Sequence, residues 1–163
     1  MNKSKLDLYI DEILEKMNMT EKDMYRELID FCTSINLRPK KVYNKNIHAV
    51  DFLNTNKNYS IMRFGINENQ DTIIELRYYA NKQYSEKFHD SIRKIIESYK
   101  GEYVGCYKCG NCQGHYTYTY PDGTTFVRCG FSLIPVGNIT VNDIPEIKHL
   151  IGIQNEAYNS TLK

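Results

Sequence analysis

The spacing of apolar residues changes twice along the chain, and this limits the fold more than any other feature of the sequence. From residue 5 to residue 35, apolar positions recur every three or four residues, which predicts amphipathic helices. Three short apolar runs separated by Asn-rich stretches follow, and they predict strands. The helical spacing returns at residue 86. Helices, then strands, then helices in separate blocks are typical of an α+β domain.

Two antiparallel helices are expected at the N-terminus. The first spans residues 5–17, and Thr20 followed by Asp23 suggests the N-cap of the second. Cys32 falls on the apolar side of the second helix, where it is expected to be buried. Residues before a proline avoid the helical region, so the helix is expected to end within residues 36–39. The apolar positions are Leu6, Ile10, Ile13, Leu14 and Met17 in the first helix and Met24, Leu28, Phe31 and Cys32 in the second.

The three apolar runs cover residues 47–53, 59–65 and 72–80. The stretches between them, 54–58 and 67–70, carry the Asn residues that suit turns. Together they predict an antiparallel β-meander, within a sheet of three to five strands.

Two further helices are expected to pack on this sheet. One covers residues 86–99 with Ser85 as its cap, and the last covers 144–158 with Asp143 as its cap. Pro145 falls in the first turn of the last helix, where its missing N–H does no harm.

The composition restricts the class of protein. The chain has 163 residues, which fits a single domain spanning 1–163. Its net charge of +1 gives no indication of nucleic acid binding, and no apolar run approaches the roughly 18 residues of a membrane span. The acidic residues of the N-terminal segment do not fit an export signal, so the cytoplasm is expected. In a reducing compartment, five cysteines indicate metal binding before disulfides.

Four of these cysteines predict one metal centre. Cys106, Cys109 and Cys112 are each separated by two residues, and Cys129 follows 17 positions after Cys112. Two residues between ligands let the chain turn so that both sulfurs meet one metal, and a glycine follows Cys109 as such turns often require. We therefore expect residues 101–135 to form a cysteine-rich knuckle and a β-hairpin, inserted between the last two helices.

The hairpin explains how the fourth ligand returns to the others. Residues 120–123, Tyr-Pro-Asp-Gly, are a strong turn signal. If Tyr120 pairs with Thr124, the register places Tyr118 opposite Phe126, Tyr116 opposite Arg128 and His115 opposite Cys129. Cys129 would then lie near Cys112 at the open end of the hairpin.

Five candidate ligands compete for four positions. Four thiolates binding zinc are the first choice, and His115 replacing one cysteine is the second. An iron–sulfur cluster is the alternative cofactor, because three cysteines at this spacing occur in bacterial ferredoxins. The ferredoxin Cys-Pro ending is absent. Thiols that bind no metal and serve a structural or redox role are the third interpretation.

The stretch Cys106-Tyr107-Lys108-Cys109-Gly110 is similar to the knuckles of zinc-ribbon and treble-clef modules. The resemblance covers a small part of the chain and implies a metal and nothing more about function. A standard ribbon would carry a second Cys-x-x-Cys pair at Cys129, and this chain does not.

Two surface features have competing interpretations. Tyr116, Tyr118 and Tyr120 share one hairpin face, which could stack on bases or a peptide, but packing against the C-terminal helix or the sheet is favoured. The cations between Arg38 and Lys45 could contact phosphates, but a solvated loop is favoured.

These features predict a non-catalytic binding or regulatory domain with a structural zinc. The alternatives are an iron–sulfur or thiol redox protein, and a small-molecule sensor or enzyme with a pocket near Glu75, Arg77 and Tyr78. The partner, whether a protein or a small molecule, is unknown. No motif in the sequence selects a reaction.

Overall fold

The computed structural model describes residues 3–99, 116–130 and 132–160. Within these ranges the chain has an α+β fold with four α-helices and a five-stranded antiparallel sheet in the order β1-β2-β3-β4-β7. The sheet strands are β1 (Arg38–Lys41), β2 (Ile47–Leu53), β3 (Ser60–Asn67), β4 (Thr72–Leu76) and β7 (Ile134–Pro135). The helices are α1 (Lys5–Leu14), α2 (Met19–Ser34), α3 (Glu86–Ser98) and α4 (Ile144–Ser160), with a short 3-10 turn, η1 (Val141–Asp143), before α4.

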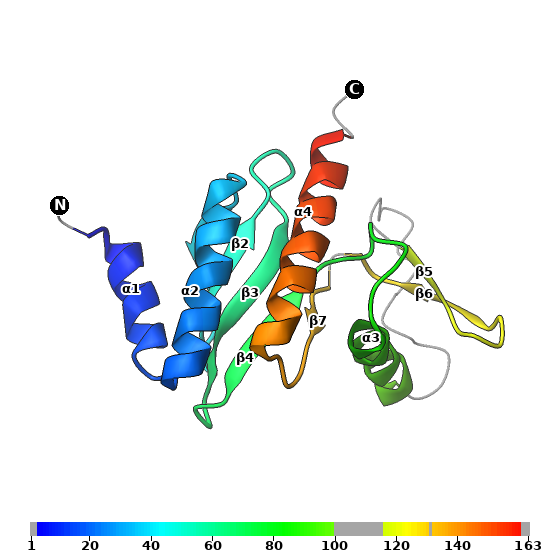
Figure 1. The fold of residues 1–163 in the computed structure, drawn as a ribbon, viewed down its shortest axis with the longest axis horizontal. Helices are drawn as coiled ribbons and strands as arrows, with labels where there is room; N and C mark the ends of the chain where they lie inside the picture. Colours follow the sequence, from blue (N-terminus) through cyan, green and yellow to red (C-terminus); the bar gives the residue numbers. More distant parts are fainter. Residues whose placement is uncertain (1–2, 100–115, 131, 161–163) are drawn as a thin grey trace.

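Three helices, α1, α2 and α4, cover one face of the sheet (Figure 1). They bury the apolar sides that the sequence spacing predicts, and Leu28 and Cys32 of α2 are completely buried. Val50, Phe64 and Ile74 occupy one register position across β2, β3 and β4 and form the sheet side of this core. Apolar burial of this kind is the main stabilising contribution to the fold.

The neighbouring register position carries charges. Asp51, Arg63 and Glu75 pair across the same three strands. Arg63 binds Asp51 at 2.6 Å and Glu75 at 3.0 Å, and all three side chains are partly exposed. Since successive side chains of a strand point to opposite faces, this row lies on the face opposite the apolar core. One face of the sheet is therefore apolar and packed, and the other carries ion pairs.

The second hairpin, β5 (Tyr116–Thr119) and β6 (Thr125–Arg128), forms a separate two-stranded sheet. Together with α3 it stands beside the β7 edge of the main sheet (Figure 1). We call α3, β5 and β6 the hairpin unit. Its position differs from the expectation that both later helices pack on the sheet. Only α4 packs there, whereas α3 packs against β7 at the edge.

The predicted hairpin register is confirmed at every described pair. Tyr116 pairs with Arg128 and Tyr118 with Phe126. The amide of Tyr120 donates to the carbonyl of Thr124 at 2.8 Å, which closes the turn.

Several local expectations are wrong. Asn18, not Thr20, caps α2, and its side chain and that of Glu21 bond each other's backbone amides. Before α4, Thr140 is the N-cap of the 3-10 turn η1, and its side chain and that of Asp143 bond each other's backbone amides. The segment expected as a basic loop is partly strand β1, because its backbone pairs with β2. Its sequence, Arg-Pro-Lys-Lys, has no apolar alternation to reveal this.

Several element bounds also differ from those predicted. The first helix ends at Leu14, three residues early, and the third strand ends at Leu76 instead of residue 80. The two-residue strand β7 was not predicted. In the ranges covered by the structure, no helix combines the length and apolar character needed to cross a membrane.

Candidate metal centre

Cys129 is the one proposed ligand that lies within the described residues. It follows Arg128, the last residue of β6, and is half-buried. It forms no disulfide with Cys32, the other described cysteine. Burial raises the pKa of the Cys32 thiol to about 12, so that residue is a neutral core thiol. Cys32 therefore belongs to the core, and Cys129 remains the described thiol at the open end of the hairpin.

Cys106, Cys109, Cys112 and the substitute ligand His115 lie outside the described residues, as does the predicted pairing of His115 with Cys129. Among the described residues alone, no group of three or more His, Cys, Asp or Glu side chains is placed to hold a metal ion. The zinc prediction therefore remains a proposal.

A buried guanidinium adjoins Cys129 in the chain. Arg128 is 1% exposed, and its guanidinium carbon lies 5.7 Å from the ring centre of Tyr99. On the other strand, burial raises the pKa of Tyr116, while the charge of Arg128 and a hydrogen bond from it act in the opposite direction. Tyr116 also stacks on Tyr79 with ring centres 5.1 Å apart. These contacts fix the open end of the hairpin against the segment that follows β4.

The hairpin is fixed to α3 by polar contacts. Tyr118 is 4% exposed and points its hydroxyl at two α3 side chains. Arg93 Nε donates to this hydroxyl at 3.2 Å, and His89 Nδ1 lies 3.0 Å from it. The aromatic face is thus used mainly in internal packing. Its polar and stacking contacts are with α3 and the chain after β4, whereas the sequence suggested the C-terminal helix or the sheet.

The residues of the suggested small-molecule pocket do not converge. Glu75 pairs with Arg63 on β3 and not with Arg77. Tyr78 is completely buried and donates its hydroxyl hydrogen to the Phe88 carbonyl at 2.8 Å. Arg77 is also buried and donates to the Tyr158 hydroxyl at 3.0 Å.

The contacts of Arg128, Arg93 and His89 could not be predicted from the sequence. An arginine directly before a candidate ligand is visible in the sequence, but its burial depends on Tyr99 and Tyr116, which come from two other segments. Arg93 and His89 are four residues apart on α3 and so share one side of that helix. Their meeting with Tyr118 depends on the docking of the hairpin, for which the sequence carries no signal.

No protein-family model, curated protein or solved structure matches the chain.

Proposed function

We propose that the chain is a small cytoplasmic binding or regulatory domain whose hairpin unit is stabilised by a structural zinc ion. The ligands are the thiolates of Cys106, Cys109, Cys112 and Cys129, with His115 as the substitute for one of them. Zinc closed by four protein ligands has no open position for water, so its role is to fix the chain and not to catalyse.

The observation that carries this proposal is the hairpin register. Because Tyr116 pairs with Arg128, Cys129 emerges where the chain enters β5. Cys112 precedes Tyr116 by four residues, and four residues of extended chain span at most about 14 Å. The register and the chain length together keep Cys112 within reach of Cys129 without a further assumption about the fold.

The buried Arg128 adds an electrostatic reason. A zinc ion with four thiolates carries a net charge of −2, and such a group is costly in a poorly solvated place unless positive charge is near. Arg128 supplies a positive charge one residue from the proposed ligand Cys129, with 1% of its surface exposed.

Elemental analysis of protein purified without oxygen tests the proposal directly. We expect one zinc per chain that resists dialysis. Cys109→Ser and Cys129→Ser should each lower the metal content and the melting temperature together, because metal binding and folding of the unit are coupled. Cys32→Ala is the matched control, since it removes a cysteine of the core and should keep the zinc.

Other results of these measurements would contradict the zinc proposal or favour its alternative. Full metal content in Cys129→Ser, or no stoichiometric metal in the wild type, contradicts the proposal. Iron with acid-labile sulfide and a brown colour would assign the cysteines to the alternative, an iron–sulfur redox protein, which the two-residue spacing of Cys106, Cys109 and Cys112 favours.

A further inference from the structure

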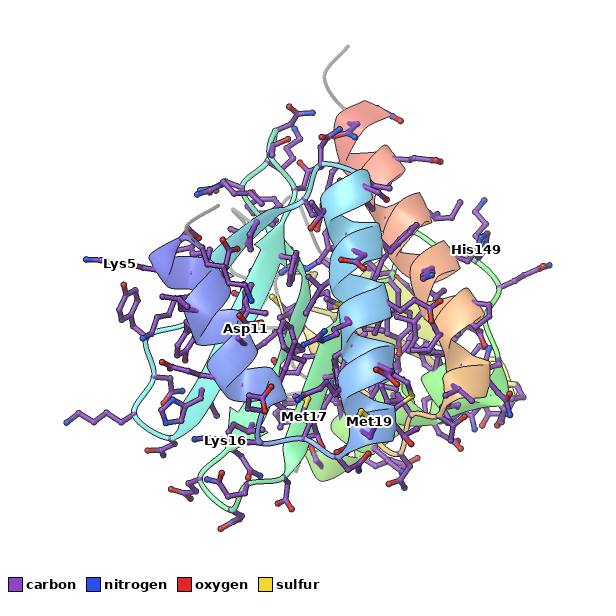
Figure 2. The ribbon with its side chains drawn as sticks, turned by 60° about the vertical axis from the view of Figure 1, so that its left-hand side comes forward. Lys5, Asp11, Lys16, Met17, Met19 and His149 are labelled. Carbon is purple, nitrogen blue, oxygen red and sulfur yellow. The ribbon has the colours of Figure 1, made fainter. Side chains whose placement is uncertain are left out.

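The surface between α1 and the β1–β2 connection carries two adjoining clefts. The first, of about 580 Å³, is lined mainly by α1, including Leu8 and Glu12. The second, of about 430 Å³, is lined by the connection, including Tyr43 and Lys45. Tyr9 and His48 line both, so the two clefts form one continuous surface, which we call the α1 groove. Figure 2 looks onto α1, where Lys5 and Asp11 are labelled, with Lys16 in the turn that follows.

Large apolar groups are exposed in the α1 groove. Tyr43 is 88% exposed at the β1–β2 connection and Leu8 is 51% exposed on α1. Tyrosines that are exposed in the free protein are common anchors of protein interfaces, because a large ring is buried at a small cost in side-chain entropy. Nearby, the Lys41 ammonium lies over the ring of Tyr9, 3.9 Å from the ring centre, in a cation–π contact.

The charges of the α1 groove have opposite signs on its two walls. The α1 wall carries three carboxylates and one lysine, Lys16. Two of the carboxylates pair with lysines, whereas Glu12 is exposed and takes part in none of the ion pairs formed by described residues. The opposite wall carries Lys45, which is likewise exposed and absent from those ion pairs. A surface with one acidic and one basic wall is complementary to a second copy of itself turned by a two-fold rotation.

We propose that the α1 groove is the interface of a homodimer. The ring of Tyr43 from each copy enters the cleft beside Leu8 of the other, and Glu12 of each copy faces Lys45 of the other. The acidic α1 wall disfavours a polyanion in the same place. Proline and lysine on the edge strand β1 disfavour dimerisation by strand addition, so the contact is made by side chains of the groove and not by a continuous sheet.

Sedimentation velocity of the full chain over a range of concentrations tests the dimer. We expect a concentration-dependent dimer in the wild type. Tyr43→Ala should raise the dissociation constant by about tenfold or more, as loss of an anchor does. Val141→Ala, which removes part of another exposed apolar side chain outside the groove, should leave it unchanged.

Charge reversal tests the pairing of the two walls. Glu12→Lys and Lys45→Glu should each weaken the dimer, and an equimolar mixture of the two variants should form a mixed dimer of wild-type affinity, because both cross-pairs are then restored. Lys82→Glu, an exposed lysine elsewhere, is the matched control and should have no effect.

The proposal is overturned if the wild type is monomeric at every concentration, if Tyr43→Ala leaves the dimer intact, or if the mixture of variants does not associate. Binding of single-stranded oligothymidylate that depends on Lys41 and Lys45 would assign the surface to a polyanion and would also overturn it.

Discussion

The core under α1 and α2 and the hairpin unit bury different kinds of side chain. Under α1 and α2 the core is apolar, with Leu28, Phe52 and Phe64 fully buried, whereas beside α4 the chain also buries polar side chains such as Asn54 and Gln154. In the hairpin unit, apolar residues of α3 are joined by the buried Arg128 and by the hydroxyl of Tyr118 bonded to Arg93. The apolar core under α1 and α2 is stabilised mainly by burial. The second depends on polar groups that are costly to bury unless their hydrogen bonds are made.

This difference bears on where the proposed metal would stabilise the fold most. A five-stranded sheet covered by three helices needs no cross-link. The hairpin unit is one helix beside a two-stranded hairpin, and small units of this kind are commonly stabilised by a metal or by disulfides. The proposed zinc lies in the region that benefits most from it.

The largest effect is expected in the apolar core. Leu28→Ala removes a completely buried side chain and should lower the free energy of unfolding by about 2–5 kcal/mol, because a cavity remains where the side chain was. Urea denaturation measures this. Met19→Ala, at a side chain 73% exposed, is the control and should change stability by less than about 0.5 kcal/mol. If the two variants lost equal amounts of stability, the burial of Leu28 would not be what stabilises the core.

A smaller and more local effect is expected in the hairpin unit. Tyr118→Phe removes the hydroxyl bonded to Arg93 and placed at His89, and should lower stability by about 1–2 kcal/mol. Amide hydrogen exchange should accelerate in β5 and β6 and not in β2 or β3. Tyr120→Phe is the matched control, since its hydroxyl makes one long contact with Glu97 at 3.5 Å. Uniform acceleration over the whole sheet would contradict the separation of the two regions.

The smallest effect concerns the ion pair that joins the regions. Lys87 of α3 lies 2.5 Å from Asp143, directly before α4. Burial acts to raise the pKa of Asp143, but hydrogen bonds from Lys87 and Thr140 outweigh it and hold that pKa below its usual 3.8. A carboxyl whose pKa is lowered by folding adds stability above its unfolded pKa, and this stability is lost as the pH falls.

Asp143→Asn should therefore cost about 1 kcal/mol near neutral pH and flatten the loss of stability below about pH 4. Denaturation curves recorded between about pH 2 and pH 7 measure this pH dependence of stability. Lys87→Met should remove part of the same pH dependence, because it removes one of the hydrogen bonds. A variant curve parallel to the wild type would show that Asp143 does not join the two regions.

The sequence predicted elements wherever local signals were sufficient. The strand at 47–53 has its predicted bounds, and the hairpin register followed from the turn at residues 120–123. The N-cap of α2 was predicted at Thr20, although Asn18 and Glu21 have the spacing of a capping box. Both N-cap signals are visible in the sequence, and the wrong one was chosen. For the proposed metal centre, the sequence supplied all the ligand candidates, and the structure describes one of them, Cys129.

The amino-acid sequence by itself determined the α+β class, the helix faces and the pairing of β5 with β6, because periodicity and turn residues act between near neighbours in the chain. Only the tertiary structure decided that Arg-Pro-Lys-Lys forms an edge strand, that α3 stands beside the sheet, and that Arg128 is buried. Each of these depends on contacts between distant segments, and a strand without apolar alternation or a buried cation becomes stable only when its partner is in place.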